Sequence, residues 1–204
     1  MKTLVVEYLP RGERSHTRKL LEAFLDEVTG TEIEELDLCE DVPELFLPER
    51  LGAYIHRDYL GEELSPGQVE LMAKMDRMAA QLVGADAVVL ATPMHNFSFP
   101  AVVKAWLDSV MLKGKTWDVS EAGFVGLMAG KRALLLMASG GIWEGDLAHM
   151  EHGQSLAKVE FGFLGYDPVN TVCANGMNLP GRDVDGVVAE RCLTVREIAR
   201  SWAD

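Results

Sequence analysis

The stretch Ala85–Met111 constrains the fold more than any other part of the chain. It opens with the uninterrupted apolar run Ala87–Ala91, which is typical of a strand buried on both faces. The run ends at Pro93, because proline cannot donate a further ladder hydrogen bond. After the polar and aromatic residues 94–99, Pro100 stands where a helix is expected to begin. An apolar stripe then follows at helical spacing: Val102, Val103, Trp106, Leu107 and Val110. The stretch therefore predicts a buried strand, a displayed loop and a helix.

Apolar and amphipathic segments alternate along the rest of the chain. We expect strands at 2–8, 31–38, 87–91, 133–138 and 168–174, and helices that begin near Thr17, Ser65, Pro100, Leu147 and Val184. Residues 43–64 and 112–126 show no clean period, so we expect loops there, with short helical pieces in the first. The alternation predicts an α/β fold in one domain over residues 1–204, with a doubly wound, five-stranded parallel sheet and helices on both faces.

Composition excludes some classes of protein. A formal charge of −13 argues against nucleic-acid binding, which needs a basic surface. The longest purely apolar run, 133–138, is far shorter than the roughly 20 residues of a membrane helix. No signal-peptide core precedes Glu7. The cysteines Cys39, Cys173 and Cys192 stand far apart, which suits free thiols in a reducing compartment. We expect a cytoplasmic protein that does not insert into membranes.

The loop after the first strand ends in hydroxyl side chains. Ser15 or Thr17 can cap the helix that follows. Alternatively, these hydroxyls, the free backbone N–H groups and the positive helix end can together hold a phosphate group. Arg11, Arg14 and Arg18 cluster nearby in an otherwise acidic chain, which slightly favours phosphate. Both interpretations stay open on the residues alone.

Two further strand ends carry features suited to a ligand. Residues 93–97 are displayed between strand and helix, and Gly140-Gly141 follows the strand at 133–138, where glycine permits close backbone approach. Competing motifs fail: no G-x-G-x-x-G follows the first strand, and the segment 126–132 lacks the spacing and the hydroxyl of a P-loop. His149 and His152 have no evident third ligand, so we expect no metal site. The remaining pattern suits a polar, planar ligand with one phosphate.

That pattern resembles a known family. Pro93-Met-His-Asn-Phe97, followed by Pro100-Ala-Val-Val-Lys104-Ala-Trp106-Leu-Asp108, is similar to the P-M-Y-N-F and P-A-x-L-K-x-W/Y-x-D motifs of the FMN-dependent NADH-azoreductase and NAD(P)H:quinone reductase family, which has a flavodoxin-like fold. Ser15-His16-Thr17 matches its S-x-S phosphate loop, and Lys115-Thr116-Trp117 and Gly140-Gly141-Ile142 match two later segments. His95 replaces the usual tyrosine, Ser139 stands where an arginine often precedes the glycines, and Leu9 replaces a hydroxyl residue of some relatives.

The resemblance implies roles for particular residues. The FMN phosphate is expected at Ser15, His16 and Thr17. The flavin ring and ribityl chain are expected along Pro93, Met94, His95, Asn96 and Phe97, with Ser139, Gly140 and Gly141 closing the other side. Substrate contacts are expected from Trp117, Trp143 and Tyr54. Family members are typically homodimers whose sites include partner residues, and Thr116-Trp117 and the aromatics from Phe46 to Tyr59 are the candidates for that second wall.

The activity that the resemblance implies is a two-electron, ping-pong reduction of quinones or azo compounds, with NADH or NADPH as hydride donor to flavin N5. No side chain is obliged to act as a general acid. His95 is the one candidate, although packing against the ring is the favoured role. A flavodoxin-type electron carrier is an alternative, but residues 10–17 do not match the T-x-T-G-x-T loop of that class. A flavin-free binding or regulatory protein on the same scaffold is the other alternative.

Overall fold

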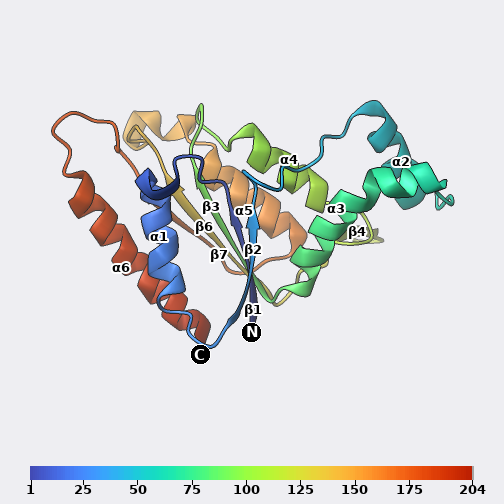
Figure 1. The fold of residues 1–204 in the computed structure, drawn as a ribbon, viewed down its shortest axis with the longest axis horizontal. Coiled ribbons are helices and arrows are strands. Elements are labelled where there is room, and N and C mark those ends of the chain that lie inside the picture. The colour runs from blue at the N-terminus through green and yellow to red at the C-terminus, as the bar shows by residue number, and fades with distance from the viewer. Residues whose placement is uncertain (204) are drawn as a thin grey trace.

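The computed structural model describes residues 1–203, and its core is a five-stranded parallel sheet. The strands are β1 (Lys2–Glu7), β2 (Glu32–Asp37), β3 (Ala87–Pro93), β6 (Arg132–Ala138) and β7 (Val169–Ala174), in the order β2-β1-β3-β6-β7. The chain starts next to the centre, steps to one edge and then crosses to the other, which is a doubly wound arrangement (Figure 1). The predicted fold class is confirmed.

Burial along the strands explains their sequence patterns. The interior of β1 and almost all of β3 and β6 are buried, because helices cover both faces of these central strands. Their continuous apolar runs supply both layers of the core. β2 lies at an edge of the sheet, and only Leu36 is buried on it, so this strand tolerates the acidic residues between its apolar positions.

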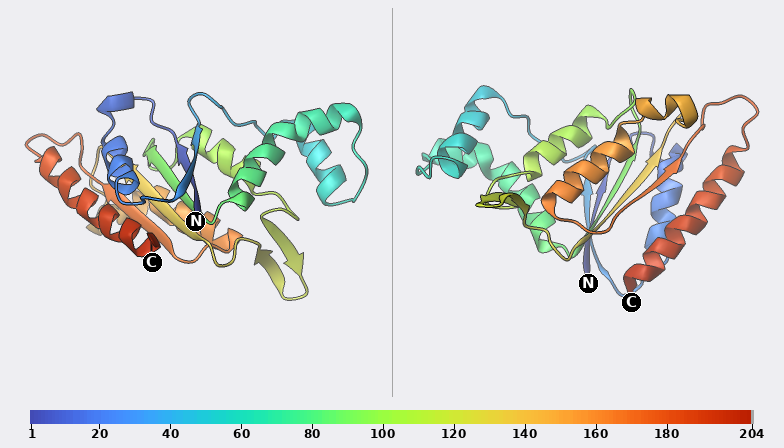
Figure 2. Two further views of the ribbon diagram at one scale, coloured as in Figure 1. Left: turned by 60° about the horizontal axis from the view of Figure 1, so that its bottom comes forward. Right: turned by 180° about the vertical axis from the view of Figure 1, so that it is seen from behind.

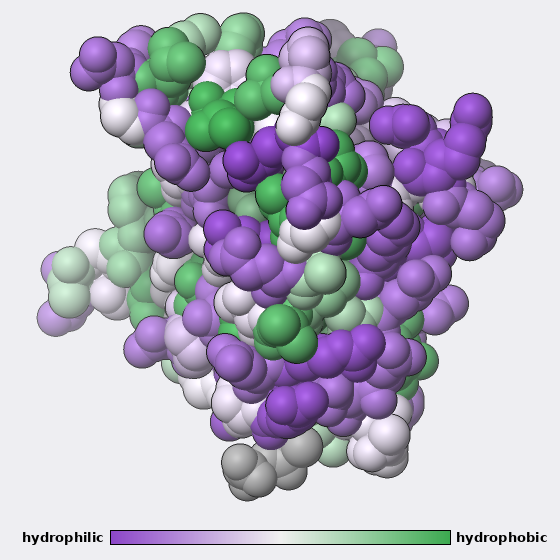
Figure 3. Space-filling model, turned by 90° about the vertical axis from the view of Figure 1, so that its left-hand side faces the viewer, coloured by the Kyte–Doolittle hydropathy of each residue, from purple (hydrophilic) through white to green (hydrophobic). Residues whose placement is uncertain are grey.

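Helices cover the two faces in separate layers. α1 (His16–Leu25) and α6 (Val184–Ala203) lie on one face, and α3 (Pro66–Gly84), α4 (Ala101–Val110) and α5 (Gly153–Leu164) lie on the other (Figures 1 and 2). The outer surface on the α1 and α6 side is mainly hydrophilic, with scattered apolar atoms (Figure 3). Within residues 1–203, no helix has the length and apolar character needed to cross a bilayer.

Helix starts follow the expected capping chemistry. The Ser65 hydroxyl accepts a hydrogen bond from the Gln68 amide, and the Gln68 side chain accepts one from the Ser65 amide, so the predicted capping box is present. Ser15 caps α1 by accepting from the Arg18 amide at 3.4 Å. α4 begins at Ala101, one residue later than expected, with Pro100 at its N-cap.

Three local predictions were wrong. The segment 43–64, expected to be a loop with short helical pieces, instead contains one continuous helix, α2 (Pro48–Asp58), over half of its length. A β-hairpin of β4 (Trp117–Ser120) and β5 (Gly123–Gly126) occupies part of the loop expected over 112–126. The helix expected from Leu147 is broken, because a 3₁₀ helix over Gly145–Met150 precedes α5. Each of these segments buries only a narrow stripe or none, so its apolar residues show no clear period.

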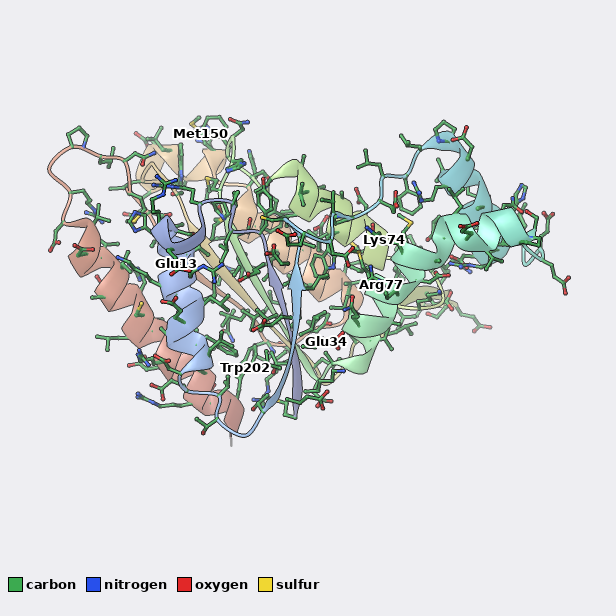
Figure 4. The ribbon with its side chains drawn as sticks, viewed as in Figure 1. Glu13, Glu34, Lys74, Arg77, Met150 and Trp202 are labelled. Carbon is green, nitrogen blue, oxygen red and sulfur yellow. The ribbon has the colours of Figure 1, made fainter. Side chains whose placement is uncertain are left out.

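Ion pairs fix the segment that follows β2 against α3. Lys74 and Arg77 project from α3 toward that segment (Figure 4), where both pair with Asp41, at 3.0 and 2.6 Å. The Lys74 amine also donates to the Val42 carbonyl at 2.9 Å. These contacts hold the start of the 42–47 strap against α3, and the Ser109 hydroxyl of α4 donates to the Glu44 carbonyl of the strap at 3.2 Å.

Candidate cofactor site

A cleft opens at the carboxyl-terminal edge of the sheet, which is the upper edge in Figure 1. Two adjoining cavities form it, of about 220 and 340 Å³, and Met94, Gly140 and Asn178 border both. The first brings together the predicted residues Ser15, His16, Thr17, Pro93, Met94, His95, Ser139 and Gly140. The second adds Asn96, Phe97, Gly141 and Trp143. The predicted residues come from three separate strand ends and Asn178 follows a fourth, and they meet because parallel strands share one carboxyl edge.

The first cavity ends at the amino terminus of α1. Ser15 is 7 % exposed and its hydroxyl caps the helix, while Thr17 is fully buried and donates to the Thr92 carbonyl at 3.5 Å. This last contact ties α1 to the end of β3, so the two walls of the cavity are held together. The first-turn amides and the positive helix end face a space that suits an anion. Capping and anion binding are thus compatible uses of the same loop.

The arginines of this loop have different surroundings. Arg11 is exposed, lines the cavity and makes no ion pair within the described residues. Arg18 instead pairs with Glu7 at 3.4 Å and does not line the cavity. Burial raises the pKa of the Glu7 carboxyl, and Arg18 partly offsets that rise. Arg11 is therefore the cation that this loop presents to a ligand in the first cavity.

His16 begins α1 inside the same cavity. Burial lowers the pKa of its imidazole, and the positive charges of Lys19 and Arg11 lower it further, against an opposing effect of Asp185. Its Nδ1 atom is buried without a hydrogen-bond partner among the described residues. His16 is therefore suited to remain neutral at pH 7 and to donate through Nε2.

The displayed loop after β3 is a tight hairpin turn. His95 and Ser98 exchange two backbone hydrogen bonds of 3.0 and 3.1 Å, and Asn96 and Phe97 between them have φ of 46° and 73°. Positive φ is costly for a residue with a bulky side chain, so this turn is held by its surroundings. The strain presents the Phe97 ring, which is 41 % exposed, to the second cavity.

The glycine pair approaches the protein's own side chains. A Cβ atom at Gly140 would lie 2.5 Å from Asn178 Nδ2, and one at Gly141 would lie 2.8 Å from Trp143 Cζ2. Only glycine permits these contacts without a shift of the neighbouring side chain. The two glycines therefore let Asn178 and Trp143 pack closely beside the cleft, and the close approach to a ligand expected from the sequence stays a prediction.

Two residues expected to contact substrate lie outside the cleft. Tyr54 is 7 % exposed, accepts from the Lys113 amide at 3.0 Å and packs against Phe46 and Tyr59. Trp117 packs against Phe124 and Phe163, with its indole bound to the Met111 carbonyl at 3.1 Å. Neither lines either cavity within one chain, so their role in substrate contact stays a prediction.

Sequence reasoning missed Met177 and Asn178, which line the first cavity from the loop after β7. The signal was available, because the carboxyl end of any strand in a parallel sheet faces the same edge. Among residues 1–203, no group of three His, Cys, Asp or Glu side chains is placed to hold a metal ion.

Comparison with known proteins defines the family. Residues 1–198 match the model of a family described by its flavodoxin-like fold, and the chain belongs to that family. It is 36 % identical over 185 residues to an FMN-dependent NADH:quinone oxidoreductase of Azotobacter vinelandii, a match that covers 88 % of this chain and 90 % of the relative.

Solved structures agree with this assignment. An azoreductase of Bacillus anthracis superposes with a TM-score of 0.90 at 26 % identity, over 98 % of this chain and 99 % of the other. An FMN-dependent NADH-azoreductase of the same species, solved in complex with FMN, superposes with a TM-score of 0.87 at 28 % identity, over 100 % and 99 % of the two chains.

Proposed function

We propose that this chain is an FMN-dependent NAD(P)H oxidoreductase that reduces quinones, azo compounds or both. The observation that carries the proposal is the two-part cleft. One part ends at a capped helix amino terminus beside a free arginine, and the other is lined by aromatic and amide side chains without a formal charge. This division fits a ligand with a phosphate at one end and a flat ring system at the other.

The residues at the polar end suit the FMN phosphate. The first-turn amides of α1, the Ser15 hydroxyl and His16 Nε2 would donate hydrogen bonds, and Arg11 would supply a positive charge. The Thr17 hydroxyl already donates to Thr92, so Thr17 would contribute its backbone amide. Leu9 is 5 % exposed and packs in the core beside α1, so it takes no part.

The residues at the apolar end suit the isoalloxazine ring. The hairpin turn 95–98 and the Gly140-Gly141 backbone would border it, and Met94 lies where the two cavities meet. The bound flavin would supply the redox chemistry by accepting a hydride equivalent and passing two electrons to an acceptor. The protein would orient the ring, exclude water from one face and supply backbone donors to its polar edge. His95 is exposed and packs edge-on against Tyr8, with ring centroids 6.1 Å apart.

A homodimer is part of the proposal, because large apolar side chains are exposed beside α4 and on the β4-β5 hairpin. Leu45 and Leu47 are 57 % and 54 % exposed beside a groove of about 390 Å³ that also borders Ala101 and Ala105 of α4. Phe124, at 72 % exposed, projects from the β4-β5 hairpin. A second copy covering these residues would bury apolar surface that a monomer leaves in water. The Thr116-Trp117 loop and residues 46–59 would then contribute to the partner's site.

The three free cysteines suit a reducing compartment, and we place the protein in the cytoplasm. Burial raises the pKa of the Cys173 thiol, which keeps it protonated and unreactive.

Steady-state turnover tests the proposed activity. The purified protein, reconstituted with FMN, should oxidise NADH or NADPH with menadione or an azo dye as acceptor, over many turnovers and in parallel-line kinetics. An electron carrier would instead be nearly inert without a partner reductase. Failure of FMN-loaded protein to oxidise either nucleotide with any acceptor of the panel would contradict the proposal.

A further inference from the structure

The Ser139 hydroxyl is fully engaged within the protein. Ser139 is 4 % exposed, and its Oγ accepts a hydrogen bond from Trp143 Nε1 at 3.1 Å. The same Oγ lies 2.9 Å from both the Gly141 carbonyl and Asn175 Oδ1, either of which can take its single proton. The hydroxyl therefore accepts from the indole N–H and donates its single proton to an acceptor of the protein. It has no proton left to donate to a ligand.

The hydrogen bond from Trp143 Nε1 to Ser139 holds the indole over the backbone of Gly141. Trp143 Cζ2 would be only 2.8 Å from a Cβ at Gly141, so the ring lies directly against that peptide. The indole edge is held at Nε1 and its ring is held by this contact. Trp143 is half-buried, and its remaining surface borders the second cavity.

Trp143 meets a second aromatic residue across the cavity mouth. The ring centroids of Phe97 and Trp143 are 5.3 Å apart with the planes at 74°, an edge-to-face pair. The backbone of Phe97 is held by the hydrogen-bonded turn 95–98. The two rings come from different strand ends, and both border the cavity that also contains Gly140 and Asn178. A planar ligand entering this cavity meets a wall of two aromatic rings.

We propose that Trp143 is a ring-contact residue of the flavin site, and that Ser139 is the positioning residue that holds its indole there. This inference rests on the proposed function, and it extends that function by two roles. Ser139 acts on the flavin through Trp143 and does not bind the cofactor with its own hydroxyl. Trp143 contacts the flavin ring of its own chain, in place of the substrate contact expected for it from the sequence.

Fluorescence of bound FMN tests both roles without measuring activity. An indole in contact with flavin quenches flavin emission by donating an electron to the excited ring, whereas phenylalanine is a poor donor. Trp143→Phe should therefore brighten bound FMN relative to the unaltered protein, and FMN should bind roughly two- to tenfold more weakly, the range for one weakened aromatic contact. Trp202→Phe is the matched control, because Trp202 packs on Phe24 near the opposite end of the sheet (Figure 4).

A double-mutant cycle tests the positioning role. Ser139→Ala should brighten bound FMN in the unaltered background, because the freed indole leaves its position. It should have no further effect on brightness or affinity in the Trp143→Phe background. Equal effects of Ser139→Ala in both backgrounds would show that Ser139 acts on FMN directly and would overturn that role.

The failure of this inference is separable from failure of the proposed function. If FMN binds but stays as dark in Trp143→Phe as in the unaltered protein, Trp143 does not contact the ring and the inference is overturned alone. If the unaltered protein does not bind FMN, the proposed function fails and the inference fails with it.

Discussion

The backbone N–H of His152 donates a hydrogen bond of 2.8 Å to the carbonyl oxygen of Phe97. His152 is the N-cap of α5, so this bond anchors the displayed turn to the start of that helix. Together with the two bonds between His95 and Ser98, it offsets the cost of placing Asn96 and Phe97 at positive φ. The turn is therefore a rigid wall of the cleft, although its side chains are exposed.

The positive φ of Phe97 predicts that glycine is more stable than alanine at this position, the reverse of their usual order inside helices and strands. Phe97→Ala and Phe97→Gly lose the same ring, but alanine keeps the left-handed penalty of about 1–2 kcal/mol and glycine does not. Glycine, on the other hand, costs about 0.5–1 kcal/mol of stability relative to alanine, because it loses more conformational freedom on folding. Phe97→Gly should therefore be more stable than Phe97→Ala by up to about 1.5 kcal/mol in urea unfolding of the apoprotein. An alanine variant more stable than the glycine variant would contradict the strained geometry.

Two serine caps separate stability from ligand binding. Ser15 and Ser65 both cap helices through their hydroxyls, so alanine at either should cost about 1 kcal/mol of unfolding free energy. Only Ser15 lines the cleft, so only Ser15→Ala should also weaken FMN binding in a fluorescence titration. An equal loss of FMN affinity in Ser65→Ala, which alters α3 and not α1, would mean that the overall stability of the protein governs binding and that the Ser15 hydroxyl does not contact FMN.

The buried carboxyl of Glu160 predicts that the unaltered protein and a Glu160→Gln variant differ in stability by an amount that depends on pH. It is 7 % exposed, burial raises the pKa of its carboxyl, and Lys104 at 3.4 Å partly lowers it. A raised folded-state pKa favours the protonated form, so its stabilising contribution is present at low pH and is lost as the pH rises through that pKa. Glu160→Gln mimics the neutral form. It should match the unaltered protein near pH 4 and exceed it in stability increasingly toward pH 7, measured by urea unfolding. A constant difference across this range would show that the carboxyl is not destabilised by burial.

The proposed dimer predicts a difference between two exposed leucines. Leu45 lies in the exposed strap beside α4, and Leu193 lies on the outer face of α6, at 57 % and 64 % exposure. Leu45→Asp should shift the protein toward monomers in sedimentation velocity, because a buried charge at the interface is costly. Leu193→Asp should leave the oligomeric state unchanged, since the α6 side is mainly hydrophilic (Figure 3). Dissociation caused by Leu193→Asp instead would place the interface on the other face.

His95 tests whether a side chain serves as proton donor. Because His95 is exposed and packs against Tyr8, a ring-packing role predicts that His95→Phe retains FMN and much of the turnover. The measurement is kcat with a quinone acceptor, with FMN content determined on the same sample. A collapse of turnover with flavin still bound would assign the general-acid role to His95.

Much of the fold was predictable because the central strands are buried on both faces. Runs such as Ala87–Ala91 have few other stable environments, and their alternation with amphipathic segments defines a doubly wound sheet. The length of α2 was not predicted beyond short helical pieces, because only Arg50, Ala53 and Tyr54 are buried on it, which is too narrow a stripe to give a clear period. The β4-β5 hairpin was missed because each of its strands has only four residues and none of them is buried, so the sequence shows no alternation of buried and exposed positions.

The site was predictable wherever its residues follow a strand end or match the family motifs. Those positions converge on the cleft because parallel strands share one carboxyl edge. What could not be predicted is which hydrogen bonds each side chain makes. The pairing of Arg18 with Glu7, and of Ser139 with Trp143, depends on distances that only the folded chain defines.

Binding of FMN by the apoprotein, compared with binding of riboflavin in the same calorimetric titration, tests the central claim most directly. The account predicts one FMN bound per chain, with riboflavin bound at least roughly tenfold more weakly because it lacks the phosphate that charge-assisted hydrogen bonds at the start of α1 would hold. Absence of FMN binding at saturating concentration, or equal affinity for both ligands, would contradict it.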